Sequence, residues 1–171
     1  MSLARLNLAA ESEEVINKQI QTELTASYAY LSMSAWLARD NVALHNISEY
    51  YRKESHEERE HATHLIDYLT KRGGRVQFLP IPQPESEWKS ATNVLEATLA
   101  MERDVTQSLM NVVAVAEKHG DAEMAEYITS EFLHEQVEAV KKAADYVTQL
   151  NTAGGTGLGL YMFDKTFRKC D

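Results

Sequence analysis

The sequence has little of what cross-links a chain or anchors it in a bilayer. Its single cysteine, Cys170, allows neither an internal disulfide nor a Cys-x-x-Cys metal site. The longest nearly apolar run, 112–116, is far shorter than the roughly 18 residues of a membrane-spanning helix, and the first residues hold no apolar stretch of signal-peptide length. Because one free thiol suits a reducing compartment, we expect a cytoplasmic protein with no membrane partner.

Positive charge is also scarce. The chain carries 17 Lys and Arg residues against 26 Asp and Glu residues, which gives a net charge of −9 with histidine neutral. Basic residues form only short pairs such as Lys141 with Lys142, so the sequence offers no basic patch for a phosphate backbone. We expect no nucleic-acid partner, and the acidic excess favours cations as ligands.

The residues that break helices are few and segregated. The seven glycines fall at 73–74, at 120 and within 154–159, and the three prolines fall within 80–84. The segments 1–72, 85–119 and 121–153 are therefore free to be helical. A chain of 171 residues fits one domain, 1–171, and buries about two-thirds of its unfolded surface, so its core needs no disulfide.

These segments predict an all-α, antiparallel four-helix bundle with no strand. We expect helices over about 12–39, 44–72, 90–119 and 121–151, a long crossover at 73–89 and a short fifth helix over about 160–168. Ser12 with its following glutamates resembles an N-cap, and Gly73 after two basic residues resembles a helix C-terminus. Short links make the first two helices one hairpin and the next two another.

Polar side chains interrupt the apolar face of every long helix. Steps of seven residues return to nearly the same face of a bundle helix, so each face can be followed along the sequence. The interruptions all fall near the middle of a helix, at one level of the bundle. They are Glu23 and Tyr30 in the first helix, Glu54, Glu58 and His61 in the second, Glu102 in the third, and Thr129 and Gln136 in the fourth.

Carboxylates that meet in a dry interior need a cation. Burying an isolated carboxylate costs on the order of several kcal/mol, and several buried carboxylates also repel one another. A single glutamate on such a face is more often a shifted register, but several at one level favour metal. An oxygen-rich set with one imidazole suits iron or manganese better than zinc, and two-iron bundle proteins use glutamates with a Glu-x-x-His pair.

Other histidines fit the surface better than a metal centre. Glu131 and His134 share the Glu-x-x-His spacing, but they fall on a largely polar face, so we interpret them as surface or cavity wall. His56 and His61 are five residues apart, which excludes the His-Glu-x-x-His zinc-protease helix. We expect His45, His56 and His119 at the surface or at helix ends.

Several motifs together resemble those of eukaryotic ferritins of the heavy-chain type. They are SHEEREHA at 55–62, YAYLSMS at 28–34, RGGR at 72–75, EQV at 135–137 and YMFDK at 161–165. The resemblance spans nearly the whole chain and implies the ferritin-like bundle. It further implies a homo-oligomeric shell of twenty-four subunits. Each subunit would oxidise Fe²⁺ with O₂ at a di-iron centre, and the shell would store the iron inside the cell as a ferric mineral.

The same resemblance implies a role for each polar residue on the buried faces. Glu23, Glu58 and His61 match the ligands of the first iron, with Glu58 bridging to the second iron, which Glu102 would hold. Tyr30 and Gln136 match residues that hydrogen-bond to ligands or bound oxygen. Glu57 matches an auxiliary ligand.

The resemblance also assigns residues outside the centre. Glu57 and Glu60 would face the cavity and help iron to move or nucleate, although Thr63 stands where the family has a third glutamate. Glu126 matches one acid of the threefold channel, whereas Thr129 replaces the second. Glu123 or Glu131 is a candidate to supply the missing charge on the iron uptake route, and 160–167 would line the fourfold axis.

Three alternatives make different predictions. A catalytically silent iron-storage subunit would carry a basic or neutral residue at one of the four ligand positions, and none appears. A DNA-protecting mini-ferritin would have a basic terminal tail and no fifth helix. A plain helical interaction module would form a small oligomer and take up no iron.

Overall fold

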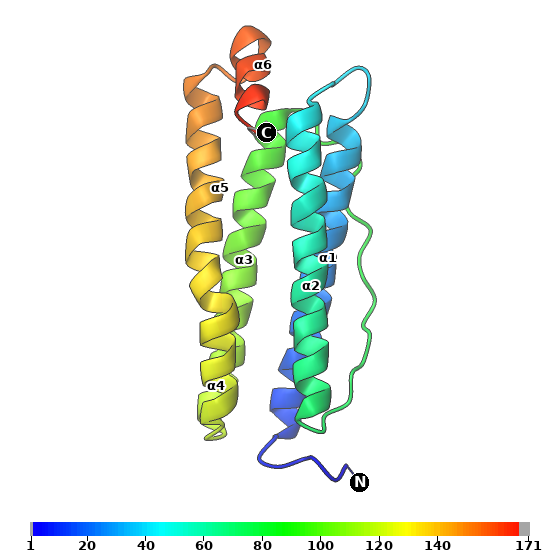
Figure 1. The fold of residues 1–171 in the computed structure, drawn as a ribbon, viewed down its shortest axis with the longest axis vertical. Coiled ribbons are helices and arrows are strands. Elements are labelled where there is room, and N and C mark those ends of the chain that lie inside the picture. The colour runs from blue at the N-terminus through cyan, green and yellow to red at the C-terminus, as the bar shows by residue number, and fades with distance from the viewer. Residues whose placement is uncertain (1, 168–171) are drawn as a thin grey trace.

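The computed structural model describes residues 2–167, and this part of the chain is helical with no strand (Figure 1). Three long helices open the chain, and the fourth rod consists of three consecutive pieces before a short last helix. The elements are α1 (Ala10–Leu37), α2 (His45–Lys71), α3 (Ala91–Lys118), α4 (Ala122–Ile128), η1 (Thr129–Leu133), α5 (His134–Thr152) and α6 (Gly157–Thr166).

The helices form the expected four-helix bundle. α1 packs against α2 and α3, and α3 packs against α4 and α5. The segment 72–90 runs back along the α1–α2 pair as an extended strap, which confirms the long crossover (Figure 1). Asn17 fixes its start, because its side chain accepts from the Gln77 N–H at 2.7 Å and donates to the Arg75 carbonyl at 3.0 Å.

The ends of the helices differ from prediction in detail. Ser12 is not the N-cap: α1 begins at Ala10 after Ala9, and Ser12 lies inside the helix with its hydroxyl buried and unpartnered. Leu8 packs into the core before the helix, and the alanines that follow extend the helix by a turn. Gly73 follows α2 with φ +76°, as expected for the left-handed residue after a helix.

The fourth rod contains a π-helical turn, η1, that the pattern of the sequence does not predict. Placing Thr129 on the buried face was therefore wrong, since Thr129 is exposed. A π turn adds one residue to the helix and shifts the register by one position. Counting back from buried Gln136, the inward positions become Phe132, Ile128 and Met124, all of which are buried.

The last helix begins earlier than expected. α6 starts at Gly157 rather than near residue 160, so part of the glycine-rich segment is helical. Gly159 is required there because a Cβ would lie 1.8 Å from the Ala153 carbonyl oxygen. The helix ends at Thr166, and the predicted end at 168 lies, like Cys170, outside the described residues.

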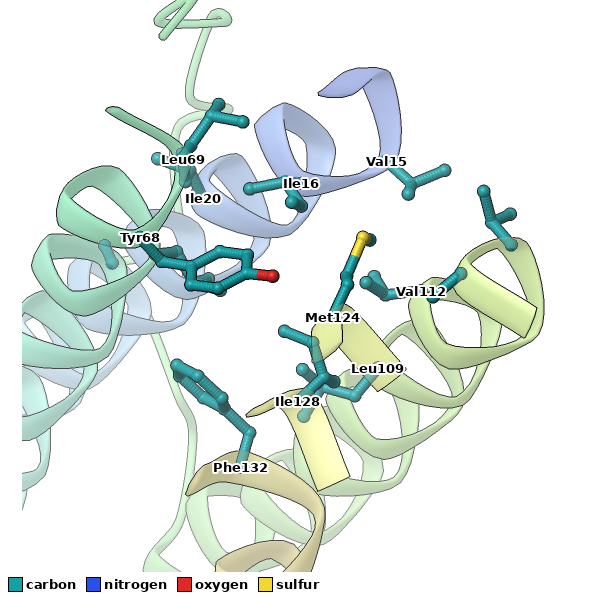
Figure 2. Packing of buried hydrophobic residues seen from close by; sticks show 14 of the residues in the cluster. Val15, Ile16, Ile20, Tyr68, Leu69, Leu109, Val112, Met124, Ile128 and Phe132 are labelled. Carbon is teal, nitrogen blue, oxygen red and sulfur yellow. The ribbon is translucent and has the colours of Figure 1, made fainter. Parts of the chain in front are cut away.

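The apolar core has two parts, one toward each end of the bundle. The first contains Ile16 of α1, Leu65 of α2 and Leu109 of α3, and Figure 2 shows it closed by Met124 and Phe132. The second contains Leu37, Tyr51 and other residues nearer α6. Between the two parts each long rod contributes polar residues, so the bundle has a polar layer at mid-height.

No helix among residues 2–167 combines the length and the apolar character needed to cross a bilayer.

Candidate metal centre

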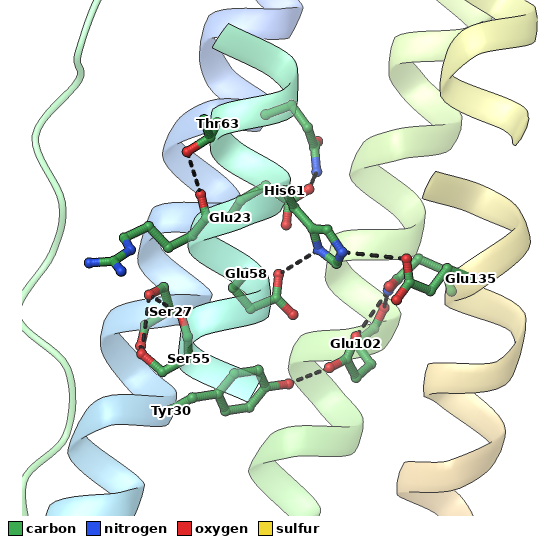
Figure 3. A network of polar contacts seen from close by, with 12 residues as sticks. Glu23, Ser27, Tyr30, Ser55, Glu58, His61, Thr63, Glu102 and Glu135 are labelled. Atoms are coloured by element: carbon green, nitrogen blue, oxygen red, sulfur yellow. Dashed lines mark hydrogen bonds and ion pairs between the residues drawn. The ribbon is translucent and has the colours of Figure 1, made fainter. Parts of the chain in front are cut away.

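The polar layer between the two halves of the core collects side chains from all four rods. We call it the central polar layer, and it is buried because apolar clusters close it on either side. Its members are Glu23 and Tyr30 of α1, Glu58 and His61 of α2, Glu102 of α3 and Gln136 of α5, which Figure 3 shows in part.

Glu23 is a carboxylate with only half of its hydrogen-bonding capacity used. The side chain is 1% exposed, and Nε2 of Gln19 donates to its Oε1 at 2.7 Å. Its second oxygen, Oε2, is buried and has no partner. A buried acceptor without a donor costs about 1–3 kcal/mol, so this oxygen points to a missing ligand.

Glu58 and His61 form the Glu-x-x-His pair on α2. Three residues along a helix place two side chains on the same face, and His61 Nδ1 lies 3.4 Å from Glu58 Oε2 (Figure 3). The other ring nitrogen, Nε2, lies 3.4 Å from Oε2 of Glu135 on α5. The imidazole therefore joins α2 to the opposite helix of the bundle.

Glu102 is held by two neighbours that orient its carboxylate. The Tyr30 hydroxyl donates to Oε1, and Nε2 of Gln136 donates to Oε2 at 3.0 Å. Gln136 also donates to the Glu102 carbonyl at 3.2 Å. These donors fix the direction of the carboxylate without neutralising its charge.

Burial changes the acidity of the layer. The pKa of Glu58 is raised to about 8, mainly by burial and then by the charge of Glu102. Burial, followed by the charge of Glu58, also raises the pKa of Glu23 well above its usual range. The Tyr30 hydroxyl has its pKa raised for the same first reason, so it stays a hydrogen-bond donor. Glu23 and Glu58 therefore hold protons that a cation can replace.

Glu23, Glu58 and His61 can bind one metal ion together. Each offers a ligand atom, and the three atoms lie within 4.8 Å of one another. Two carboxylates and an imidazole are a donor set that suits iron or manganese. The unpartnered oxygen of Glu23 and the protonated Glu58 fit the same conclusion, because a divalent cation would satisfy both.

The remaining predicted residues are exposed and are not part of this buried layer. Glu57 and Glu60 are exposed on α2, and Glu126 and Thr129 are exposed on the fourth rod. The structure of one chain does not bring them together into a site. Glu131 and His134 are exposed as well, as expected for surface or cavity wall, and His45, His56 and His119 are exposed as expected.

Sequence reasoning missed two neighbours of the centre. Gln19, one turn before Glu23, supplies the hydrogen bond that orients its carboxylate, and the i, i+4 spacing was a signal for it. Glu135, which precedes Gln136, reaches His61, although its side chain is 56% exposed. Its outward position in the helical pattern hid that contact.

Comparison with known proteins agrees with this geometry. Residues 13–153 match a family model described as a ferritin-like domain. The chain is 45% identical over 166 residues to soma ferritin of Lymnaea stagnalis and 47% identical over 166 residues to a ferritin heavy chain of Echinococcus granulosus. Each match covers 96% of this chain and 95% of the relative. The chain belongs to the ferritin family.

Proposed function

We propose that this chain stores iron and is a ferroxidase, which oxidises Fe²⁺ to Fe³⁺ with O₂ at a di-iron centre inside the bundle. The observation that carries the proposal is the convergence of three buried glutamates and one histidine at a single level. Membership of the ferritin family and the similarity to ferritin heavy chains support the same activity.

The residues divide into two positions for substrate iron. Glu23, Glu58 and His61 bind the first Fe²⁺, since their ligand atoms already lie close together. Glu58 bridges to the second ion, which Glu102 binds. Tyr30 and Gln136 hold the Glu102 carboxylate in place. Because hard carboxylate oxygens favour Fe³⁺ over Fe²⁺, this ligand set promotes oxidation.

Proton release accompanies iron binding in this proposal. The raised pKa of Glu58, about 8, means that the carboxyl carries a proton at neutral pH in the metal-free chain. Fe²⁺ displaces that proton, and its affinity therefore rises with pH. Glu135, partly exposed beside His61, gives the ferric product an anionic group on the way out of the layer.

The alternatives fit less well. A catalytically silent subunit would lack one of the four ligands, but Glu23, Glu58, His61 and Glu102 are all present and meet in one layer. A mini-ferritin would lack the fifth helix, whereas α6 is formed and packs against α2 and α5. A plain interaction module gives no reason to bury three acids.

The test replaces Glu58 and His61 together, as Glu58→Gln with His61→Asn. We expect rapid aerobic Fe²⁺ oxidation, followed by absorbance in stopped flow, to be lost while assembly on size exclusion is unchanged. The matched control is Glu131→Gln with His134→Asn, a pair with the same spacing but exposed. Rates are compared at saturating Fe²⁺, so that any role of Glu131 in iron delivery does not affect them.

Undiminished oxidation in the Glu58/His61 variant would overturn the site. Equal loss in both variants would show that the effect comes from surface charge and not from the buried layer.

The proposal includes a shell of twenty-four copies in the cytoplasm. The family supports an oligomeric shell, and the single cysteine of the sequence favours a reducing compartment. Exposed Glu57 and Glu60 would face the cavity, and Glu126 with Glu131 would attract iron on the uptake route. Electron microscopy before and after aerobic iron loading tests the shell and its mineral.

A further inference from the structure

A run of tyrosine rings leads from the central polar layer toward α6. Tyr30, which donates to Glu102, has its ring centroid 5.6 Å from that of Tyr51. Tyr51 lies 5.2 Å from Tyr50, and Tyr50 lies 5.7 Å from Tyr146 on α5. We call these four residues the tyrosine path. Ring separations of this size are short enough for an electron to pass from one ring to the next.

The three inner tyrosines differ in where a proton can go. A phenol gives up an electron readily only if its proton leaves with it, because the phenol radical cation is a strong acid. Tyr51 shares its proton with the Thr98 hydroxyl at 2.8 Å, which is a poor base. The Tyr30 hydroxyl donates to Glu102, but that carboxylate binds iron in the proposed function and is then not free to accept the proton.

Tyr50 is the one inner tyrosine that lies beside a carboxylate outside the ligand set, namely Glu54, one turn later on α2. Lys142 Nζ contacts both groups, lying 3.0 Å from Oε1 of Glu54 and 4.6 Å from the centroid of the Tyr50 ring. Glu54 is therefore held in place as an anion beside the phenol. Burial raises the pKa of Glu54 despite the opposing effect of Lys142, which makes it a better proton acceptor than a surface acid.

We propose that Tyr50 is a redox-active residue that protects the metal centre, giving one electron through Tyr51 and Tyr30 and passing its proton to Glu54. This inference rests on the proposed ferroxidase function, which supplies the oxidant. Reduction of O₂ by two electrons yields hydrogen peroxide. When peroxide meets a single Fe²⁺, that ion gives one electron, the O–O bond breaks, and hydroxide and a hydroxyl radical form.

The protective step is balanced in electrons and protons. The electron from Tyr50 converts the hydroxyl radical to hydroxide. The phenolic proton moves to the Glu54 carboxylate, leaving a neutral tyrosyl radical and a carboxylic acid. Tyr146, half-buried at the far end of the path, extends it from Tyr50 toward α6. Without the path the hydroxyl radical would attack the ligands themselves.

The test is electron paramagnetic resonance of freeze-quenched samples. Metal-free assembled protein is mixed with a single equivalent of Fe²⁺ per centre and then with hydrogen peroxide. We expect an organic radical signal that narrows when the tyrosines are ring-deuterated and is lost in Tyr50→Phe. Tyr127→Phe is the matched control, because Tyr127 is half-buried and stacks on Tyr68 in the other half of the core.

Further readouts separate this inference from a packing role. Tyr50→Phe should keep the wild-type initial rate of Fe²⁺ oxidation by O₂, and mass spectrometry should find more oxidised His61. Glu54→Gln keeps the phenol but removes the base, so it should also lose the radical. It therefore tests the proposal even if Tyr50→Phe does not fold.

The outcomes distinguish the two proposals. Failure of the wild-type protein to oxidise Fe²⁺ would overturn the ferroxidase function. Normal oxidation with no tyrosyl radical, or with a radical retained in full in Tyr50→Phe or Glu54→Gln, would overturn only the role of Tyr50.

Discussion

The bundle buries acids in two different ways, at its ends and at its centre. Near the ends, Asp121 and Asp164 are 1% and 2% exposed, and their oxygens accept from N–H donors. Asp121 accepts from the Met124 N–H at 3.1 Å and from Arg72 at 2.8 Å. At the centre, Glu23 and Glu58 face each other, and one oxygen of Glu23 has no partner.

Asp164 shows how a buried acid can support the fold. It lies on α6 and accepts from the backbone N–H groups of Asn46 and Ile47, each at 3.1 Å. These groups begin α2, whose own N-cap residue, Leu44, makes no side-chain hydrogen bond. A carboxylate at a helix N-terminus is stabilised by free N–H groups and the helix dipole. Asp164 thus caps one helix from another.

The difference separates structural acids from functional ones. An acid that is matched by donors at its own site stabilises the metal-free fold. In the central polar layer, Glu23 and Glu58 are matched only partly, and their raised pKa values show that the metal-free fold disfavours their charge. Stability is given up at the centre to keep a place for cations.

The largest effect is expected where a structural acid loses its cation. In Arg72→Met, Asp121 stays buried without its partner, and breaking such a pair typically costs about 3 kcal/mol or more of unfolding free energy. Denaturant unfolding of the metal-free protein measures the loss. The double variant with Asp121→Asn should be more stable than Arg72→Met alone, since no unpaired charge is buried. Equal stability would show that Asp121 is not matched by Arg72.

The second prediction concerns the pH dependence at the centre. Because the pKa of Glu58 is about 8 in the folded chain and near 4.5 ordinarily, the folded state holds the proton more tightly between these values. The metal-free protein should therefore lose stability as pH rises from 4.5 to 8, by on the order of 1 kcal/mol per pH unit. Thermal unfolding in chelator measures the slope, which Glu58→Gln should flatten.

A redox-inert divalent ion sharpens this prediction. Zn²⁺ competes with the protons on the acids, so its stabilising effect should grow as pH rises. Glu58→Gln should lose most of that effect. If the pH dependence of stability were the same in Glu58→Gln as in the wild type, a group other than Glu58 would be responsible for it.

The third prediction returns to the end of the bundle. Asp164→Ala removes the cap of α2 and should cost about 1 kcal/mol of unfolding free energy. Hydrogen exchange should become faster in α6 and in the first turn of α2, with no change around Glu102. Asn46→Ala, which removes one side-chain donor to Asp164 but leaves the N–H groups, should cost less. Faster exchange at the centre would contradict the separation of the two kinds of acid.

Much of this was predictable from the sequence, because local chemistry repeats along a helix. Steps of seven placed Glu23, Glu58 and Glu102 inward, and all three are buried. The segregation of glycine and proline gave three helical segments and the long crossover, and the expected helices 12–39 and 44–72 divide the first segment into two rods. These features depend on periodicity and helix breakers, which one sequence contains in full.

The structural features that could not be predicted from the sequence depend on contacts between rods. The π turn η1 shifts the register by one residue, so a count in sevens places Thr129 inward when it is exposed. The cap of α2 comes from Asp164, which lies 118 residues after Asn46. No local signal marks either feature, because each is decided by how the rods pack.

The smallest effect is expected for a pair that is neither structural nor functional. Lys18 and Glu14 form an i, i+4 ion pair on α1 at 2.7 Å, with side chains 59% and 64% exposed. Water screens both charges whether or not they meet, and such pairs contribute about 0.5 kcal/mol or less. Lys18→Ala should leave the thermal midpoint, its pH slope and the Zn²⁺ effect nearly unchanged. A loss as large as that of Asp164→Ala would show that exposure does not divide the charges of this bundle, and that the contrast between its ends and its centre has another cause.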